Sequence, residues 1–178
     1  MSYMIKSPDA KNVKFAHVYL SSNMTDITIP STGVAVATNQ KCLFDSINAS
    51  SGIGITVSNG DITLSAKDYI VYVVPTINIV NITNLTPGSF NILLTLYLNG
   101  VEISSQFHCE GSVVSAAASN ANGSSSTLGV ASFSAQSGDV LTLLMDADNL
   151  STSLSLGLRV IGNSNADPHS LFIWEIDR

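Results

Sequence analysis

The chain has 178 residues, a formal net charge of −6 and 11% charged residues, less than half of the roughly 25% typical of soluble domains. Hydrophobic residues make up 45%, and Ser, Thr and Asn together fill 55 positions. This composition excludes an acidic disordered tail, a nucleic-acid binder with a basic stripe, and a membrane span of about 18 apolar residues. One domain is expected at this length.

The start of the chain is more basic than the rest. Lys6, Lys11 and Lys14 stand there against a single acidic residue, a local charge of +2 that leaves −8 on the remainder. We therefore expect an N-terminal arm over residues 1–14 and one domain over residues 15–178. The arm is either a docking segment for an acidic neighbour or a solvated terminus. Its lack of an apolar run argues against a secretory signal.

Beyond the arm, apolar residues recur at every second position, which is the period of a β-strand. The expected strand segments are 15–20, 27–29, 42–44, 52–57, 62–64, 69–82, 90–98, 101–104, 129–135, 139–145, 154–161 and 170–176. Pro75 cannot donate to a sheet ladder, so the segment that contains it should break in two there. The pairs Asn59-Gly60 and Asn99-Gly100 suit type I′ turns, so each predicts a tight hairpin.

Residues 115–127 consist mainly of Ala, Ser, Asn and Gly. We expect an exposed loop there rather than a helix. Loops on a rigid sandwich often carry recognition, so this loop is either a binding surface or a tip without function.

The strand pattern, with turn signals every 8–15 residues, predicts an all-β, antiparallel jelly-roll sandwich of about ten short strands. Three segments resemble the C1q/TNF-like jelly rolls. Residues 88–104 resemble the family's central hairpin, 133–143 its strand pair around Gly-Asp, and 168–176 its final strand at the trimer axis. The resemblance covers roughly residues 40–178, and it implies a compact homotrimer that acts by binding rather than by catalysis.

The last segment carries the single tryptophan. Phe172, Trp174 and Ile176 alternate along it and share one face, which indicates core packing or a trimer contact. Stacking of a carbohydrate on Trp174 is the alternative.

Two acidic residues alternate in Asp146-Ala147-Asp148-Asn149. Carboxylates at this spacing can gather oxygen atoms around Ca²⁺, and in a trimer three copies can share one site. An ordinary acidic turn between strands is the alternative, and no other cofactor is expected.

Residues suited to catalysis are few. His17, His108 and His169 lie in unrelated segments, and no Walker loop, nucleophile elbow or metalloprotease motif is present. Cys109 follows His108, but successive strand residues point to opposite faces, so the two do not form a nucleophile pair. Cys42 and Cys109 are expected to be buried thiols, with a disulfide as the alternative. The sequence therefore predicts that the protein is not an enzyme.

The functional hypothesis is a non-enzymatic structural protein of a virus or phage particle, either a capsid decoration or a fibre head. It would be made in the host cytoplasm and bind to a capsid or particle surface through Lys6, Lys11 and Lys14, without nucleic acid or membrane as partner. The alternatives are a spore or bacterial surface protein of C1q-like type and a soluble carbohydrate-recognition domain.

Overall fold

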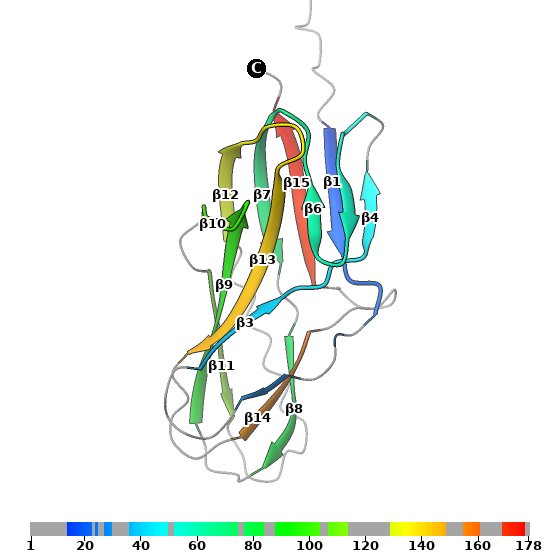
Figure 1. Cartoon of the computed structure of the whole chain (residues 1–178). Helices are drawn as coiled ribbons and strands as arrows, with labels where there is room; N and C mark the ends of the chain where they lie inside the picture. The colour runs from blue at the N-terminus through cyan, green and yellow to red at the C-terminus, as the bar shows by residue number, and fades with distance from the viewer. Residues whose placement is uncertain are drawn as a thin grey trace, which may run out of the picture.

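The computed structural model describes residues 14–22, 24, 27–29, 36–49, 52–74, 77–83, 88–103, 107–113, 129–148, 155–160 and 169–176. Within these residues every helix or strand element is a β-strand (Figure 1). The strands are β1 (Lys14–Tyr19), β2 (Ile27–Ile29), β3 (Val36–Lys41), β4 (Ser46–Ala49), β5 (Thr56–Ser58), β6 (Asp61–Thr63), β7 (Asp68–Val74), β8 (Ile77–Thr83), β9 (Gly88–Leu98), β10 (Val101–Glu102), β11 (Phe107–Val113), β12 (Gly129–Ser134), β13 (Val140–Asp148), β14 (Ser155–Val160) and β15 (Ser170–Ile176). No helix in this part of the chain is long and apolar enough to cross a membrane.

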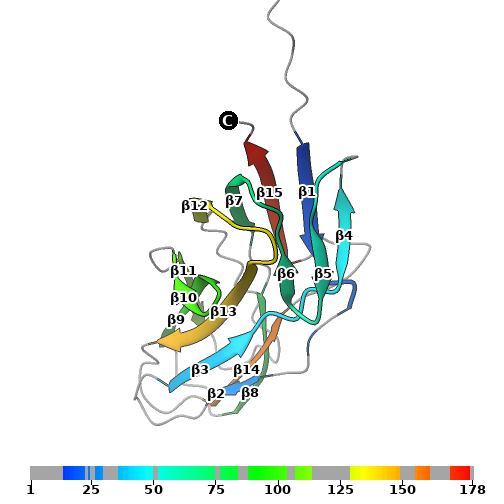
Figure 2. The same ribbon diagram turned by 45° about the horizontal axis from the view of Figure 1, so that its top comes forward.

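Two antiparallel sheets form the body of the molecule (Figures 1 and 2). The five-stranded sheet has the order β12-β7-β15-β1-β4. The seven-stranded sheet has the order β10-β9-β13-β6-β5, with β11 also paired to β9 and β3 to β13. The chain crosses between the two large sheets after β1, β3, β4, β6, β7, β11, β12 and β13, which is the connection pattern of a jelly roll. The predicted fold class, an antiparallel jelly-roll sandwich, is confirmed.

A third, smaller sheet continues the five-stranded one. Its order, β2-β14-β8, repeats the order of the central strands β1-β15-β7. Along the chain β2 follows β1, β8 follows β7, and β14 precedes β15, so the same three passes of the chain build both sheets. The break predicted at Pro75 is confirmed, because β7 ends at Val74 and β8 begins at Ile77 in a different sheet.

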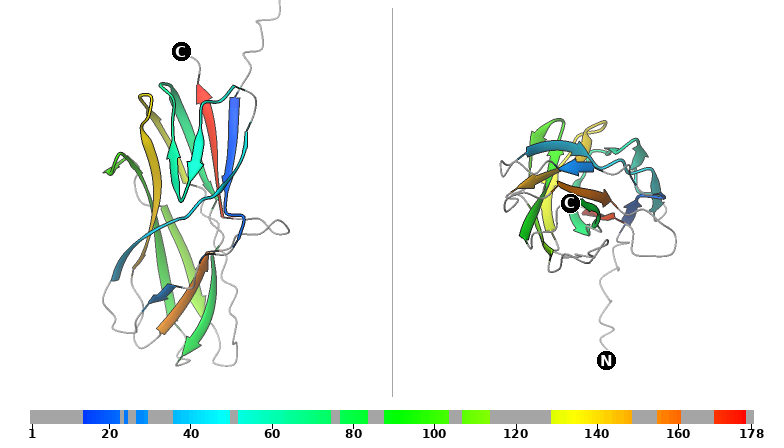
Figure 3. Two further views of the ribbon diagram at one scale, coloured as in Figure 1. Left: turned by 45° about the vertical axis from the view of Figure 1, so that its right-hand side comes forward. Right: turned by 90° about the horizontal axis from the view of Figure 1, so that it is seen from below.

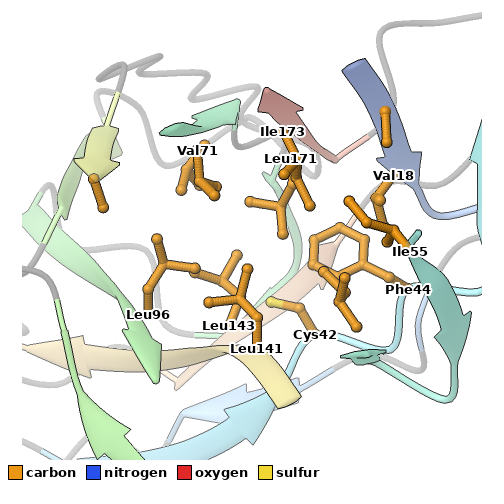
Figure 4. Packing of buried hydrophobic residues seen from close by; sticks show 14 of the residues in the cluster. Val18, Cys42, Phe44, Ile55, Val71, Leu96, Leu141, Leu143, Leu171 and Ile173 are labelled. Atoms are coloured by element: carbon orange, nitrogen blue, oxygen red, sulfur yellow. The ribbon is translucent and has the colours of Figure 1, made fainter. Parts of the chain in front are cut away.

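The hydrophobic core lies between the five-stranded and seven-stranded sheets (Figure 4). Each fully buried Leu, Ile or Phe contributes about 1.5–3 kcal/mol through the loss of water contact. The hydroxyl of Tyr69 lies 2.8 Å from the hydroxyl of Ser65, so its polar atom is satisfied inside the sandwich. The largest fully buried side chains are Phe44, Ile62, Leu64, Tyr69, Leu94, Leu96, Leu141, Leu143 and Met145.

One expected strand is instead a crossing between sheets. Residues 42–44 connect β3 of the seven-stranded sheet to β4 of the five-stranded sheet. Cys42 and Phe44 are fully buried, which explains the apolar alternation, but the segment belongs to neither ladder. The backbone N–H of Cys42 donates to the carbonyl of Leu143 at 2.9 Å, and Gly60 donates to the carbonyl of Phe44 at 2.8 Å. The alternation therefore reports burial rather than strand pairing.

Both predicted Asn-Gly hairpins are confirmed. Asn59 and Gly60 join β5 to β6 with φ angles of 50° and 80°, and Asn99 and Gly100 join β9 to β10 with φ angles of 51° and 78°. Positive φ at both central positions is the geometry of a type I′ turn, which Asn and Gly adopt most readily.

Candidate functional site: an aromatic sheet face

β15 divides its side chains between two faces. Leu171 and Ile173 are fully buried in the core. Phe172 and Trp174 are half-buried, and Ile176 is 39% exposed. Core packing, one of the two roles expected for Phe172, Trp174 and Ile176, thus belongs to Leu171 and Ile173 on the opposite face of the strand. The three residues lie on the outer surface of the five-stranded sheet, and a subunit contact stays a prediction.

β1 follows the same alternation beside β15. Ala16 and Val18 are fully buried, whereas Phe15 is 44% exposed and His17 and Tyr19 are half-buried. Unlike the row on β15, this outer row of β1 was not predicted as a candidate site. The signal is nevertheless present in the sequence, because three ring-bearing residues at every second position share one face of a strand.

The sheet register brings these rows together with β7 and β12. Trp174 pairs with Phe15 on one side and Ile70 on the other, and Phe172 pairs with His17 and Tyr72. We call the resulting surface the aromatic face. Its members are Phe15, His17, Tyr19, Ile70, Tyr72, Val74, Val130, Phe172, Trp174 and Ile176.

The rings of the aromatic face contact one another. The centroids of His17 and Phe172 lie 4.5 Å apart with their planes only 3° from parallel. Tyr72 meets Trp174 edge-on at 4.8 Å, and Phe172 lies 6.0 Å from Trp174. Such contacts between aromatic rings are favourable beyond the apolar area that they bury, so they stabilise this arrangement of the face.

His17 lies midway along β1, at the side of the aromatic face that borders β4. Its Nε2 lies 2.9 Å from the hydroxyl oxygen of Ser170, the first residue of β15. Burial lowers the pKa of His17, because the charged imidazolium loses hydration among the rings. The face is therefore uncharged near neutral pH at this position.

Glu175, the one ionisable residue of β15, lies on the inner side of the sheet. The carboxylate of Glu175 is only 2% exposed, and it accepts from Lys14 at 2.9 Å and lies 3.5 Å from the Nζ of Lys67. Lys14, expected in the docking arm, is thus the first residue of β1 and ion-paired to the end of β15. Lys6 and Lys11 lie outside the described residues, so the docking role of the arm stays a prediction.

The three histidines are not brought together as a catalytic set. His17 lies on the outer face of β1, and His169 is completely buried beside Phe44, with 5.6 Å between ring centroids. His108 and Cys109 occupy successive positions of β11, opposite Leu93 and Ile92 of β9. The side chains of β11 lie outside the described residues.

The acidic pair proposed for Ca²⁺ lies in a strand rather than in a turn. Asp146 and Asp148 belong to β13 and pair with Leu93 and Asn91 of β9. The register of β13 against β3 shifts between Met145 and Ala147, so this stretch is an irregular strand. Among the side chains that the structure describes, no cluster of three or more His, Cys, Asp or Glu residues is placed to hold a metal. The Asp146 and Asp148 side chains and the loop at 115–127 fall outside that part, so binding of Ca²⁺ stays a prediction.

Comparison with known proteins finds no relative by sequence. No protein-family model and no curated protein matches the chain. Among solved structures, two crystal structures of murine APRIL resemble it. The structure at pH 8.0 is 12% identical with a TM-score of 0.48, covering 93% of this chain and 100% of that one. The structure at pH 8.5 is 13% identical with a TM-score of 0.41, covering 83% and 98%. A likeness this distant places the chain in no family and assigns it no function.

Proposed function

We propose that the protein is a non-enzymatic structural protein that assembles as a homotrimer through its aromatic face. The observation that carries this proposal is the face itself. Monomeric proteins rarely expose large contiguous apolar patches, whereas aromatic residues are enriched and charged residues depleted at the centre of protein interfaces. The outer positions of β1, β15 and the middle of β7 combine five aromatic rings and His17, and the carboxylate of Asp68 lies only at the end of this face, opposite Ile176.

A second copy of the chain is the occupant that the surface favours. The low overall charge of 11% leaves few groups to keep such a face in water, so covering it with copies of itself accounts for the composition. Three copies are proposed because the segments 88–104, 133–143 and 168–176 resemble trimeric C1q/TNF-like jelly rolls. In a three-fold ring each subunit presents one side of the face to the next subunit, and the ring closes.

The setting we propose for the trimer is a virus or phage particle, as a capsid decoration or fibre head. The support is the basic character of the N-terminal residues beside an acidic body, which suits docking on an acidic surface. A spore or bacterial surface protein uses the same trimer in another setting. Carbohydrate recognition is favoured by a separate observation, the half-exposed ring of Trp174 beside Tyr72.

Sedimentation velocity tests the trimer. The wild-type protein should have about three times the chain mass of 18.7 kDa. Val130→Asp and Phe15→Asp each place a carboxylate on the aromatic face, at side chains exposed by 51% and 44% in the single subunit. We expect both to shift the protein to single chains while it stays folded, because burying an unpaired carboxylate costs more than the roughly 2–7 kcal/mol of an unpaired neutral polar group.

Val101→Asp is the matched control. Val101 is 67% exposed on β10, in the seven-stranded sheet, so the same substitution lies away from the aromatic face. It should leave the trimer intact. A single-chain mass for the wild-type protein, or equal disruption by Val101→Asp, contradicts self-association through this face. A glycan array that binds the wild-type protein but not Trp174→Ala identifies the carbohydrate alternative.

A further inference from the structure

His17 is the member of the aromatic face that can take up a proton in mildly acidic solution. Its ring is stacked on Phe172 and tilted against Tyr19 at 5.0 Å, so apolar ring surface flanks it on its own strand and across the ladder. In a trimer built through this face, three copies of His17 are removed from water together. A charge at this position is therefore buried three times in each assembly.

The hydrogen bond of His17 does not oppose protonation. A serine hydroxyl donates and accepts, so Ser170 can partner the ring nitrogen in either protonation state. What changes on protonation is the charge of the ring. An effect of pH on the aromatic face is thus an effect of charge and hydration rather than of a lost contact.

The titratable groups around His17 supply no carboxylate to balance it. On β1, Tyr19 shares the outer face, and Lys14 is ion-paired with Glu175 of β15. Glu175 is on the inner side, and two lysines already contact it. The outer positions of β15 carry no ionisable group, since they are Ser170, Phe172, Trp174 and Ile176.

The neighbouring strands give the same result. On β4, Asn48 pairs with His17, and Asp45, which precedes this strand, accepts hydrogen bonds from Ser21 at 2.6 and 2.8 Å. On β7, Tyr72 pairs with Phe172, and Asp68 lies on the same outer face opposite Ile176, four residues along the strand from Tyr72, where it accepts from Ser134. An imidazolium at His17 is thus left without a carboxylate partner among the side chains of the subunit that the structure describes.

We propose that His17 makes the assembly pH-sensitive, so that protonation of the three copies in mildly acidic solution separates the subunits. This inference rests on the proposed self-association through the aromatic face. The free subunit can hydrate a charged His17, whereas the assembly has to bury it against apolar surface and near two equal charges. Proton binding therefore favours the separated subunits, and the assembly loosens as the pH falls through the titration range of histidine.

Sedimentation velocity at about pH 7.5 and about pH 5 measures the effect, because exposed histidine titrates between these values. For the wild-type protein we expect an association constant at least about tenfold lower at the acidic pH, which corresponds to about 1.4 kcal/mol. His17→Gln and His17→Phe cannot take up the proton and should stay assembled at both pH values. His17→Arg carries a permanent charge and should be dissociated already at pH 7.5.

His108→Gln is the matched control, since His108 lies in β11 of the seven-stranded sheet. It should dissociate at acidic pH like the wild-type protein. Circular dichroism at both pH values separates dissociation from unfolding. A folded wild-type trimer that persists at pH 5, or a His17→Gln variant that dissociates as the wild type does, overturns the role of His17 but leaves the proposed trimer standing. A single-chain mass at pH 7.5 overturns both.

Discussion

His169 is a buried histidine just before β15 begins. Its ring stacks on Phe44, and its backbone carbonyl accepts from the N–H of Leu20 at 3.3 Å, so it joins the ends of two strands to the crossing segment. Complete burial lowers the pKa of His169 from 6.5 to about 4, because the charged ring would lose its hydration. The folded protein therefore keeps this ring neutral at pH values where an exposed histidine is charged.

The free energy of unfolding should consequently fall as the pH is lowered from 6.5 towards 4. In this interval the unfolded chain binds a proton at His169 that the folded chain does not bind. The contribution of neutral His169 to the free energy of unfolding is complete above the pKa of the unfolded chain, 6.5, and is lost once the pH reaches the pKa of the folded chain, about 4. The total loss is about 3 kcal/mol for a pKa difference of two to three. Urea unfolding at about pH 7 and about pH 4.5 measures the loss, and His169→Gln should reduce it.

Two other groups set the controls for that measurement. Burial also lowers the pKa of His17, so it adds a loss of stability in the same direction, and His17→Gln measures its share. The pKa of Asp139 is lowered by hydrogen bonds from the backbone of Gln136 and the side chain of Asn99. Its contribution to the free energy of unfolding is therefore lost only as the pH falls below the ordinary aspartate pKa of 3.8. An unchanged loss of stability in His169→Gln would show that the buried ring is not its source.

At the scale of an element, the two Asn-Gly turns have the same backbone but different surroundings. Gly60 and Gly100 both have φ near 80°, a region that side chains rarely adopt. A Cβ atom on Gly60 would lie 2.4 Å from the carbonyl oxygen of Cys42, whereas one on Gly100 would meet nothing within 4 Å. The β5–β6 turn is thus pressed against the crossing segment, and the β9–β10 turn is open.

Substitution by alanine should separate these two contexts. Gly100→Ala has only the backbone cost, roughly 1 kcal/mol. Gly60→Ala has the same cost and must also displace the backbone at Cys42, so its free energy of unfolding should be lower by a further ~1–3 kcal/mol. Urea unfolding of both variants at neutral pH measures the difference. Equal losses of unfolding free energy in the two variants would mean that the backbone at Cys42 moves away from the new Cβ atom without an energetic cost.

The strands that could be predicted are those whose side chains alternate strongly. β7, β9 and β15 are rich in β-branched, aromatic and leucine residues, and all three were expected near their observed bounds. β3, β4 and β11 were missed, because Val-Ala-Thr-Asn-Gln-Lys, Ser-Ile-Asn-Ala and Phe-His-Cys-Glu-Gly-Ser-Val have little apolar alternation. They lie beside β13, β1 and β9, so pairing with a neighbour decides their structure rather than local propensity.

The aromatic face could be predicted only in part for a related reason. Alternation within residues 170–176 identifies Phe172, Trp174 and Ile176 as one row. It does not show which side of the row faces the core, nor that Phe15 lies opposite Trp174, about 160 residues away in the chain. A register over such a separation depends on the whole sandwich, and a shift of one residue would turn the row inward.

At the scale of the whole molecule, both chain ends of the described structure lie at one end of the sandwich. β1 begins and β15 ends there, with Lys14 opposite Glu175 in the register (Figure 3). Their ion pair, joined by Lys67, anchors the point at which residues 1–13 are attached. In a trimer formed through the aromatic face, three such attachment points lie at the same end, so three arms can act on one docking surface.

Deleting residues 1–13 should therefore remove docking without affecting assembly. We expect the shortened protein to keep the trimer mass and the wild-type melting temperature, since β1 and its ion pair remain. It should no longer co-purify with the particle. Portal, terminase or major capsid genes beside the gene for this protein would identify that particle as a virus or phage. Lys6→Glu with Lys11→Glu should have the same effect through charge alone, and Ser2→Ala with Ser7→Ala is the matched control. Unchanged incorporation of the shortened protein would refute docking through the arm, and neighbouring spore-coat genes would favour the spore-surface alternative.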